Sequence, residues 1–165
     1  GLCTGTNEGI QSSVLYITIY LVMNFGFFSC LFMLKRNDKY YENIEDLSGL
    51  SKNHPLIALS FLIMLFSLAG IPPLAGFFAK FYIFKAVLAQ SMYYLAIIGL
   101  LSTVIAAFYY LRLVKVMYFD SEKEKYDSDY SMGLKFTLTL STILILFYFI
   151  YPSKLIEIVS KINII

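Results

Sequence analysis

Residues 67–76 read Ser-Leu-Ala-Gly-Ile-Pro-Pro-Leu-Ala-Gly, and they interrupt an apolar stretch that covers residues 55–90. A continuous helix over that stretch would be about 50 Å long, whereas the hydrocarbon core of a bilayer is about 30 Å thick. Proline lacks a backbone N–H, so the two prolines leave the carbonyls around Leu68 and Ala69 without their helical donors. The sequence therefore predicts a transmembrane helix that is broken near 70–76.

Four residues define the predicted loop of the broken helix: Gly70, Pro72, Pro73 and Gly76. The glycines permit unusual backbone dihedral angles on either side of the prolines. Non-helical backbone at membrane depth is stable only where it is buried in protein or lines a water-filled cavity, and transporters handle ions at such breaks. The alternative is a simple proline kink that serves only helix packing. The density of glycine and proline favours the break.

The composition of the chain is that of a membrane protein. Of its 165 residues, 59% are hydrophobic and only 15% are charged, which excludes a soluble enzyme of ordinary composition. Runs of about 20 apolar residues mark transmembrane helices. We therefore predict an all-α polytopic helix bundle, a single membrane unit over 1–165, with four spans at 14–34, 55–90, 92–119 and 132–151. The charged segments at 35–54 and 120–131 are predicted to be matrix or cytoplasmic loops.

The lysines and arginines predict the orientation of the bundle. Nine of them fall on the side of the two long loops: Lys35, Arg36, Lys39, Lys52, Arg112, Lys115, Lys123, Lys125 and Lys135. The opposite side holds Lys85, Lys154 and Lys161. Short loops rich in Lys and Arg stay on the cytoplasmic or matrix face. We therefore expect both termini outside and both long loops inside.

Few residues of this chain are suited to metal or cofactor chemistry. It has two cysteines and one histidine, whereas a zinc site or an iron–sulfur cluster takes about four ligands from this set. Its 13 Lys and Arg residues nearly balance its 11 Asp and Glu residues, so no basic face for nucleic acid is expected. The sequence predicts no metal, no cofactor and no nucleic-acid partner for this chain.

Lys80 is the most costly residue in the predicted spans. It lies four residues after Gly76 and ten before Gln90, about 15 Å from that helix end and too deep to snorkel comfortably. A charged lysine there costs about 2.5–3.5 kcal/mol, so it should face protein or water, where it can load and release a proton. The alternative is a structural lysine paired with a carboxylate. Because the four predicted spans contain no acid at depth, such a partner must come from another part of the protein.

Two hydroxyls of the third predicted span are the other polar candidates. Ser102 and Thr103 are predicted to line a hydration path for protons, although side chains of this kind more often bond to a neighbouring turn or helix. Lys85 lies about five residues from its helix end, so we expect it to snorkel to the interface.

The string Gly-Ile-Pro-Pro-Leu-Ala-Gly-Phe-Phe-Ala-Lys at 70–80 is specific for one protein superfamily. Together with Asp-Leu-Ser-Gly-Leu-Ser-Lys at 46–52 and the segments at 5–11 and 107–115, it resembles the antiporter-like membrane subunits of respiratory complex I. The similarity is strongest to the NADH dehydrogenase subunit 2 family. It covers about residues 5 to 120, and the last span fits by position and hydrophobicity.

This resemblance implies a subunit built from inverted repeats, of which the chain, starting at Gly1 rather than Met, would be the C-terminal portion. Lys80 would be the catalytic lysine that transfers protons in the outer half of the channel. The rest of the channel would lie on helices that this chain lacks. The resemblance also implies a non-redox subunit of a proton-translocating NADH:ubiquinone reductase, with no complete active site here. NADH, FMN, iron–sulfur clusters and quinone would belong to other subunits.

The implied partners are other membrane subunits of complex I, including the N-terminal part of the same subunit, and the lipid bilayer. The implied location is the mitochondrial inner membrane, with a bacterial plasma membrane as the alternative. Two other functions stay open. The chain would otherwise belong to a multi-subunit cation/proton antiporter, or it would be a purely structural packing element in which Lys80 pins neighbouring helices.

Overall fold

The computed structural model describes residues 1–36, 39–40, 43–121, 126, 130–150 and 152–161. Its longer helices are α1 (Asn7–Met33), α3 (Pro55–Ala69), α4 (Ala75–Ala89), α5 (Tyr93–Phe119), α6 (Met132–Phe147) and α7 (Pro152–Ser160). Its shorter elements are η1 (Leu2–Thr4), β1 (Lys35–Arg36), β2 (Lys39–Tyr40), η2 (Ile44–Leu47), α2 (Leu50–Asn53) and η3 (Tyr148–Ile150). The predicted all-α class is confirmed, with one antiparallel pair of two-residue strands, β1 and β2, beside the helices.

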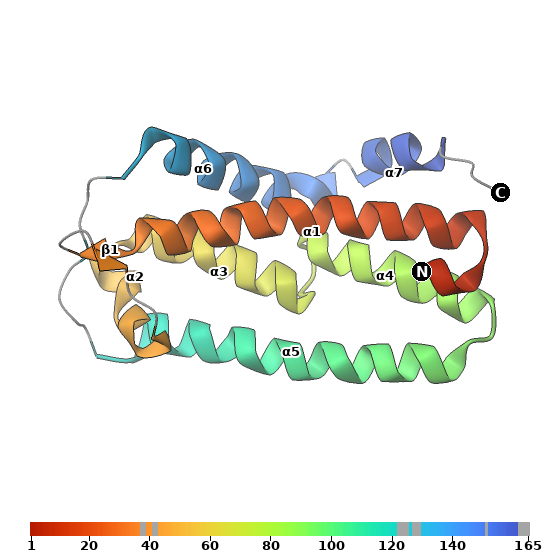
Figure 1. Ribbon diagram of the computed structural model, residues 1–165, viewed down its shortest axis with the longest axis horizontal. Coiled ribbons are helices and arrows are strands. Elements are labelled where there is room, and N and C mark those ends of the chain that lie inside the picture. The colour runs from red at the N-terminus through yellow and green to blue at the C-terminus, as the bar shows by residue number, and fades with distance from the viewer. Residues whose placement is uncertain (37–38, 41–42, 122–125, 127–129, 151, 162–165) are drawn as a thin grey trace.

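The helices form an elongated bundle around α1. This helix contacts α3, α4, α6 and α7, while α5 packs against α3 and α4 (Figure 1). Helices α3 and α4 follow one another along the length of α1 and α5 (Figure 1). The N-terminus and the end of α7 lie at one end of the bundle, and β1 and α2 lie at the other (Figure 1).

In the described part of the chain, three segments are long and apolar enough to cross a membrane: Asn7–Met33, Tyr93–Phe119 and Met132–Ile150. Helix α3 is apolar but has only 15 residues, which makes it about 22 Å long and shorter than a bilayer core of about 30 Å. Five residues separate the end of α3 from the start of α4, and α4 adds 15 more residues.

Two helices differ in extent from the predicted spans. Helix α1 begins at Asn7, ahead of the predicted span at 14–34, because Thr6 caps it by accepting the N–H of Gly9 at 3.1 Å. The predicted fourth span ended at Pro152, whereas the chain continues as α7 from that proline. Proline is well suited to the first position of a helix, where its missing N–H has no intrahelical acceptor.

Parts of the predicted loops lie outside the described residues. These are 37–38 and 41–42 in the first loop, and 122–125 and 127–129 in the second, which include Lys123 and Lys125 of the orientation count. Residue 151, the last residue of the predicted fourth span, lies outside them too.

Buried apolar side chains join the helices in two clusters. The first includes Cys30, Phe61 and Met117 and lies toward the end that carries α2. The second includes Met23 and Ala79 and surrounds the junction of α3 and α4. Leu68, Leu74 and Ala75 therefore fix the two sides of the junction in this cluster, whereas Pro72 and Pro73 between them are exposed.

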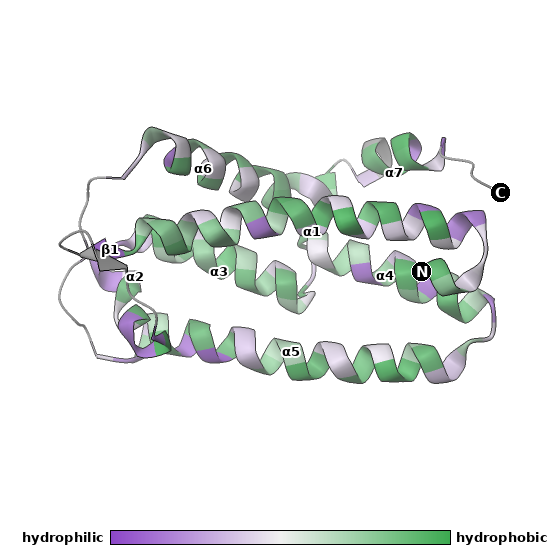
Figure 2. Ribbon diagram, viewed as in Figure 1, coloured by the Kyte–Doolittle hydropathy of each residue, from purple (hydrophilic) through white to green (hydrophobic). Residues whose placement is uncertain are grey.

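The outer surface of the bundle is apolar as well. Figure 2 shows hydrophobic residues along α1, α3, α5 and α6, with hydrophilic ones gathered near α2. Helix α5 exposes large side chains, among them Tyr94, Ile98, Leu101 and Phe108. Such a continuous apolar surface is stable against lipid or against further protein, and not against water.

Candidate functional site

Helix α3 ends in a turn that leaves two carbonyl groups available. Gly70 has φ 88° and donates its N–H to Ser67 O at 3.0 Å, and Ile71 N–H reaches Phe66 O at 3.0 Å. This is the bonding pattern of a Schellman cap, for which glycine is favoured because its φ is positive. The next carbonyls, of Leu68 and Ala69, would accept from residues 72 and 73 in a continuous helix, but both are prolines.

The Lys80 side chain donates hydrogen bonds to both of these carbonyl groups. Its Nζ donates to Leu68 O at 2.8 Å and to Ala69 O at 3.2 Å. The stem passes directly over Gly70, where a Cβ would lie 3.2 Å from Lys80 Cδ. The negative end of the α3 helix dipole also favours a positive charge at this position. Lys80 is half-buried, and the carbonyls replace part of the hydration that its ammonium group loses.

The first turn of α4 is attached to the last turn of α3. Gly76 N–H donates to Ser67 Oγ at 3.0 Å, and Ser67 Oγ donates to Met23 Sδ of α1 at 3.0 Å. Because Lys80 lies one helical turn beyond Gly76, this contact is close to the lysine in sequence and in space.

Two cavities border Lys80, with volumes of about 310 Å³ and 180 Å³. Both are lined by Tyr16, Lys80, Ser102 and Thr103. The larger extends past Phe84 and Leu95 to Gly1, at the end of the bundle that carries the N-terminus. The smaller extends to Tyr20 and Tyr110. Each has room for several waters, since one water occupies about 30 Å³ in the liquid.

The predicted candidates therefore lie near one another. Lys80, Gly70 and Gly76 meet at the junction, and Ser102 and Thr103 face Lys80 across the cavities. The two hydroxyls donate to carbonyls of their own helix, Ser102 to Gly99 O and Thr103 to Leu100 O, both at 2.7 Å. Their oxygens keep lone pairs that can accept from water.

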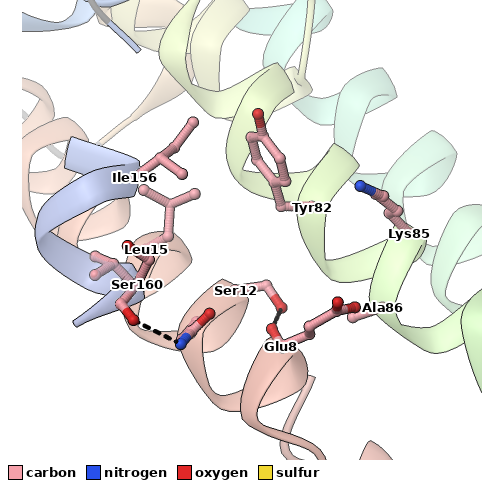
Figure 3. Close-up of a pocket in the computed structure, with 10 residues that line it drawn as sticks. Glu8, Ser12, Leu15, Tyr82, Lys85, Ala86, Ile156 and Ser160 are labelled. Atoms are coloured by element: carbon pink, nitrogen blue, oxygen red, sulfur yellow. Dashed lines mark hydrogen bonds between the residues drawn. The ribbon is translucent and has the colours of Figure 1, made fainter. Parts of the chain in front are cut away.

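Lys85 lies on a different face of α4. With Glu8, Tyr82 and Ser160 it lines a separate pocket of about 200 Å³ between α1, α4 and α7 (Figure 3). Lys85 is exposed, so it is a matched comparison for Lys80 on the same helix.

No carboxylate forms an ion pair with Lys80 among the residues that the structure describes. The ion pair at 3.6 Å between Lys161 and Glu157 is on the exposed part of α7. Across the same residues, no group of three or more His, Cys, Asp or Glu side chains is placed to hold a metal ion.

Sequence reasoning missed Ser67 and three tyrosines of the site, Tyr16, Tyr20 and Tyr110. Tyr16 and Tyr20 are spaced four residues apart, which places them on one face of α1, and their rings stack at 5.9 Å. That spacing was a usable signal in the sequence. The face of α1 that meets α4 had no such signal, because the hydropathy of α1 differs little between its faces.

Residues 1–106 match the family model described as NADH:quinone oxidoreductase/Mrp antiporter, transmembrane. The chain belongs to this antiporter family. It is 75% identical over all of its 165 residues to NADH-quinone oxidoreductase subunit N of Pelagibacter ubique, of which it covers 35%. It is 48% identical over 156 residues to the subunit of the same name from Parvibaculum lavamentivorans, covering 94% of this chain and 32% of that one. The chain spans about a third of the length of these curated relatives.

The solved structures of the antiporter family share the fold. A chain of respiratory complex I from Thermus thermophilus superposes with a TM-score of 0.77 at 24% identity, over 89% of this chain and 34% of that one. A chain of the Mrp complex from Dietzia sp. gives a TM-score of 0.75 at 18% identity, over 94% and 37%. The superfamily of antiporter-like membrane subunits predicted from the sequence is thus confirmed by the family model. The relatives that the chain resembles are named subunit N rather than subunit 2. The chain is a multi-pass membrane segment of an antiporter-like subunit.

Proposed function

We propose that this chain is part of a proton-translocating subunit in the membrane arm of an NADH:quinone oxidoreductase, with Lys80 as its proton-transferring residue. One observation carries the proposal. The ammonium of Lys80 is held by two carbonyls that prolines have released from helical bonding, and it borders two cavities at once. The family membership and the names of the relatives support the wider assignment.

In this proposal α3 and α4 together form one discontinuous span. Neither helix is long enough alone, since 15 residues rise about 22 Å, whereas the pair matches α1 in length. The break then lies inside the bilayer, where irregular backbone requires protein or water around it. The cavities beside Lys80 and the packing of α1 supply both.

The proton step follows from the contacts of Lys80. In its charged form the ammonium donates to Leu68 O and Ala69 O, and these bonds are stronger than those between neutral groups. When the ammonium gives one proton to a cavity water, a neutral amine and a hydronium ion result. Ser102, Thr103 and the backbone carbonyls can orient that water. Uptake of a proton from the other cavity restores the charge.

The proposal places the rest of the reaction elsewhere. NADH, FMN, iron–sulfur clusters and quinone would be bound by other subunits, and the preceding helices of the same subunit would complete the channel. Because the named relatives are bacterial, we favour a bacterial plasma membrane over a mitochondrial inner membrane. The loop end, rich in Lys and Arg, would face the cytoplasm and both termini the outside.

A second candidate function is a subunit of a multi-subunit cation/proton antiporter. The fold shared with the Mrp complex favours it. The two functions differ in their partners. A complex I subunit co-purifies with peripheral subunits that contain flavin and iron–sulfur clusters, and an Mrp-type subunit does not. The third function, a packing element, predicts that loss of Lys80 disturbs assembly without slowing proton pumping specifically.

The test replaces Lys80 by Met in the complex that contains this chain, in its native membranes. We expect a normally assembled complex in which proton pumping and NADH:quinone turnover fall together. Lys85→Met, on an exposed face of the same helix, is the matched control and should keep both activities. Normal pumping by the Lys80→Met complex would refute the proposal, and loss of assembly without a specific pumping defect would favour the packing element.

A further inference from the structure

We infer that Ser67 is a positioning residue that holds Lys80 against the carbonyls at the end of α3. The inference rests on the function proposed for Lys80 above. Ser67 lies on the last turn of α3, directly before Leu68, and its exposed fraction is 0%. A hydroxyl buried among apolar groups is unfavourable unless it is hydrogen-bonded. The buried hydroxyl of Ser67 is hydrogen-bonded to groups on two other helices.

Its oxygen joins three helices. Ser67 Oγ accepts the N–H of Gly76 at 3.0 Å and donates to Met23 Sδ at 3.0 Å. Gly76 is the second residue of α4, and N–H groups in a first turn have no acceptor within their own helix. The Ser67 side chain of α3 therefore caps the N-terminus of α4. Its bond to Met23 also connects the junction of α3 and α4 to α1.

The backbones of the two helices touch at the same point. A Cβ at Gly76 would collide with the carbonyl oxygen of Ser67, so only glycine allows this approach. The hydrogen bond then sets how the first turn of α4 lies on the last turn of α3. Lys80 follows Gly76 by one turn, and Leu68 follows Ser67 directly. One bond thus sets the separation between the ammonium group and its two carbonyl acceptors.

This arrangement predicts a specific defect when the hydroxyl is removed. A hydrogen bond weakens steeply as its distance and angle depart from the optimum. If the α4 turn shifts, the carbonyls hold the ammonium of Lys80 less firmly, and the alkaline limb of coupled turnover moves. The other titratable groups that line the smaller Lys80 cavity, Tyr16 and Tyr20 of α1 and Tyr110 of α5, are the same in the variant. A packing defect alone would instead reduce the amount or the activity of the complex equally at every pH.

The experiment measures coupled NADH:quinone turnover against pH in membranes that carry Ser67→Ala. We expect the midpoint of the alkaline limb to move toward lower pH by about 0.5 pH unit, equivalent to the loss of a modest hydrogen bond. One variant serves as a control and should leave the midpoint unchanged. Ser13→Ala removes a buried hydroxyl that bonds only to its own helix, at Gly9 O.

The outcomes separate this inference from the proposed function. If Ser67→Ala lowers turnover by the same factor at every pH, the positioning role of Ser67 is wrong. This conclusion holds even if Lys80→Met abolishes pumping. A midpoint that moves equally in Ser13→Ala overturns the positioning role as well. If Ser67→Ala assembles too poorly to assay, Ser67→Cys carries the same expectation, since a thiol is a weak acceptor of similar size. Normal pumping by Lys80→Met refutes the proposed function itself.

Discussion

Gly76 is the residue at which the two short helices meet. A hydrogen atom in place of a side chain lets the α4 backbone lie against the Ser67 carbonyl. Lys80 and its two carbonyl acceptors then come within hydrogen-bonding distance of each other. The absence of one methyl group therefore controls the geometry of the whole junction.

Gly76→Ala should consequently destabilise the subunit. The added methyl collides with backbone rather than with a flexible side chain, and overpacking of this kind costs about 1–3 kcal/mol. We expect less assembled complex in the membrane and an earlier thermal transition in detergent. Gly133→Ala on α6 is the control, because a Cβ there meets only Ser131 Oγ at 3.7 Å. An assembled Gly76→Ala complex as stable as Gly133→Ala would contradict the contact.

Helix α5 shows how an element places neighbouring residues in different surroundings. Tyr109 is 58% exposed on the outer face of the helix. Tyr110, rotated by about 100° around the helix axis, packs against both buried clusters and lines the smaller Lys80 cavity. Tyrosines that anchor a helix at the membrane interface are exposed, and of the two only Tyr109 has that exposure.

Tyr110→Phe should therefore slow coupled proton transport, because it removes a hydroxyl from the cavity and keeps the ring that packs there. The expected loss is about fivefold, the rate equivalent of one hydrogen bond of about 1 kcal/mol. Pumping by assembled complexes in sealed vesicles measures it. Tyr109→Phe should have no effect. Equal rates in the two variants would show that the Tyr110 hydroxyl takes no part in proton transfer.

At the scale of the whole molecule, the two ends of the bundle differ. One end carries the N-terminus and the end of α7, and the other carries β1 and α2 (Figure 1). Leu47 of η2 belongs to the same buried cluster as Leu50 of α2. The apolar surface between the two ends extends over the long helices (Figure 2). An orientation with the loop end in the cytoplasm therefore places these two ends on opposite sides of the membrane.

Cysteine labelling tests this orientation. In a Cys3→Ser background, Glu45→Cys in exposed η2 should react with a membrane-impermeant maleimide only in inverted vesicles. Lys161→Cys, beyond α7 and 73% exposed, should react only in right-side-out vesicles. The remaining thiol, Cys30, is buried and should stay unlabelled. Labelling of positions 45 and 161 from the same side would contradict the orientation.

The sequence alone determined the features that depend on local chemistry. Length and hydropathy of the apolar runs indicated a helical membrane protein, and the missing N–H groups of Pro72 and Pro73 marked where a helix cannot continue. Only the tertiary structure decided which groups meet across helices. Ser67 bonds to Gly76 nine residues away and to Met23 on another helix, and Tyr110 faces the cavity while Tyr109 does not. The physical reason is that the hydropathy of these helices differs little between their faces, so it does not indicate which face is buried, and packing against the neighbouring helices makes that choice.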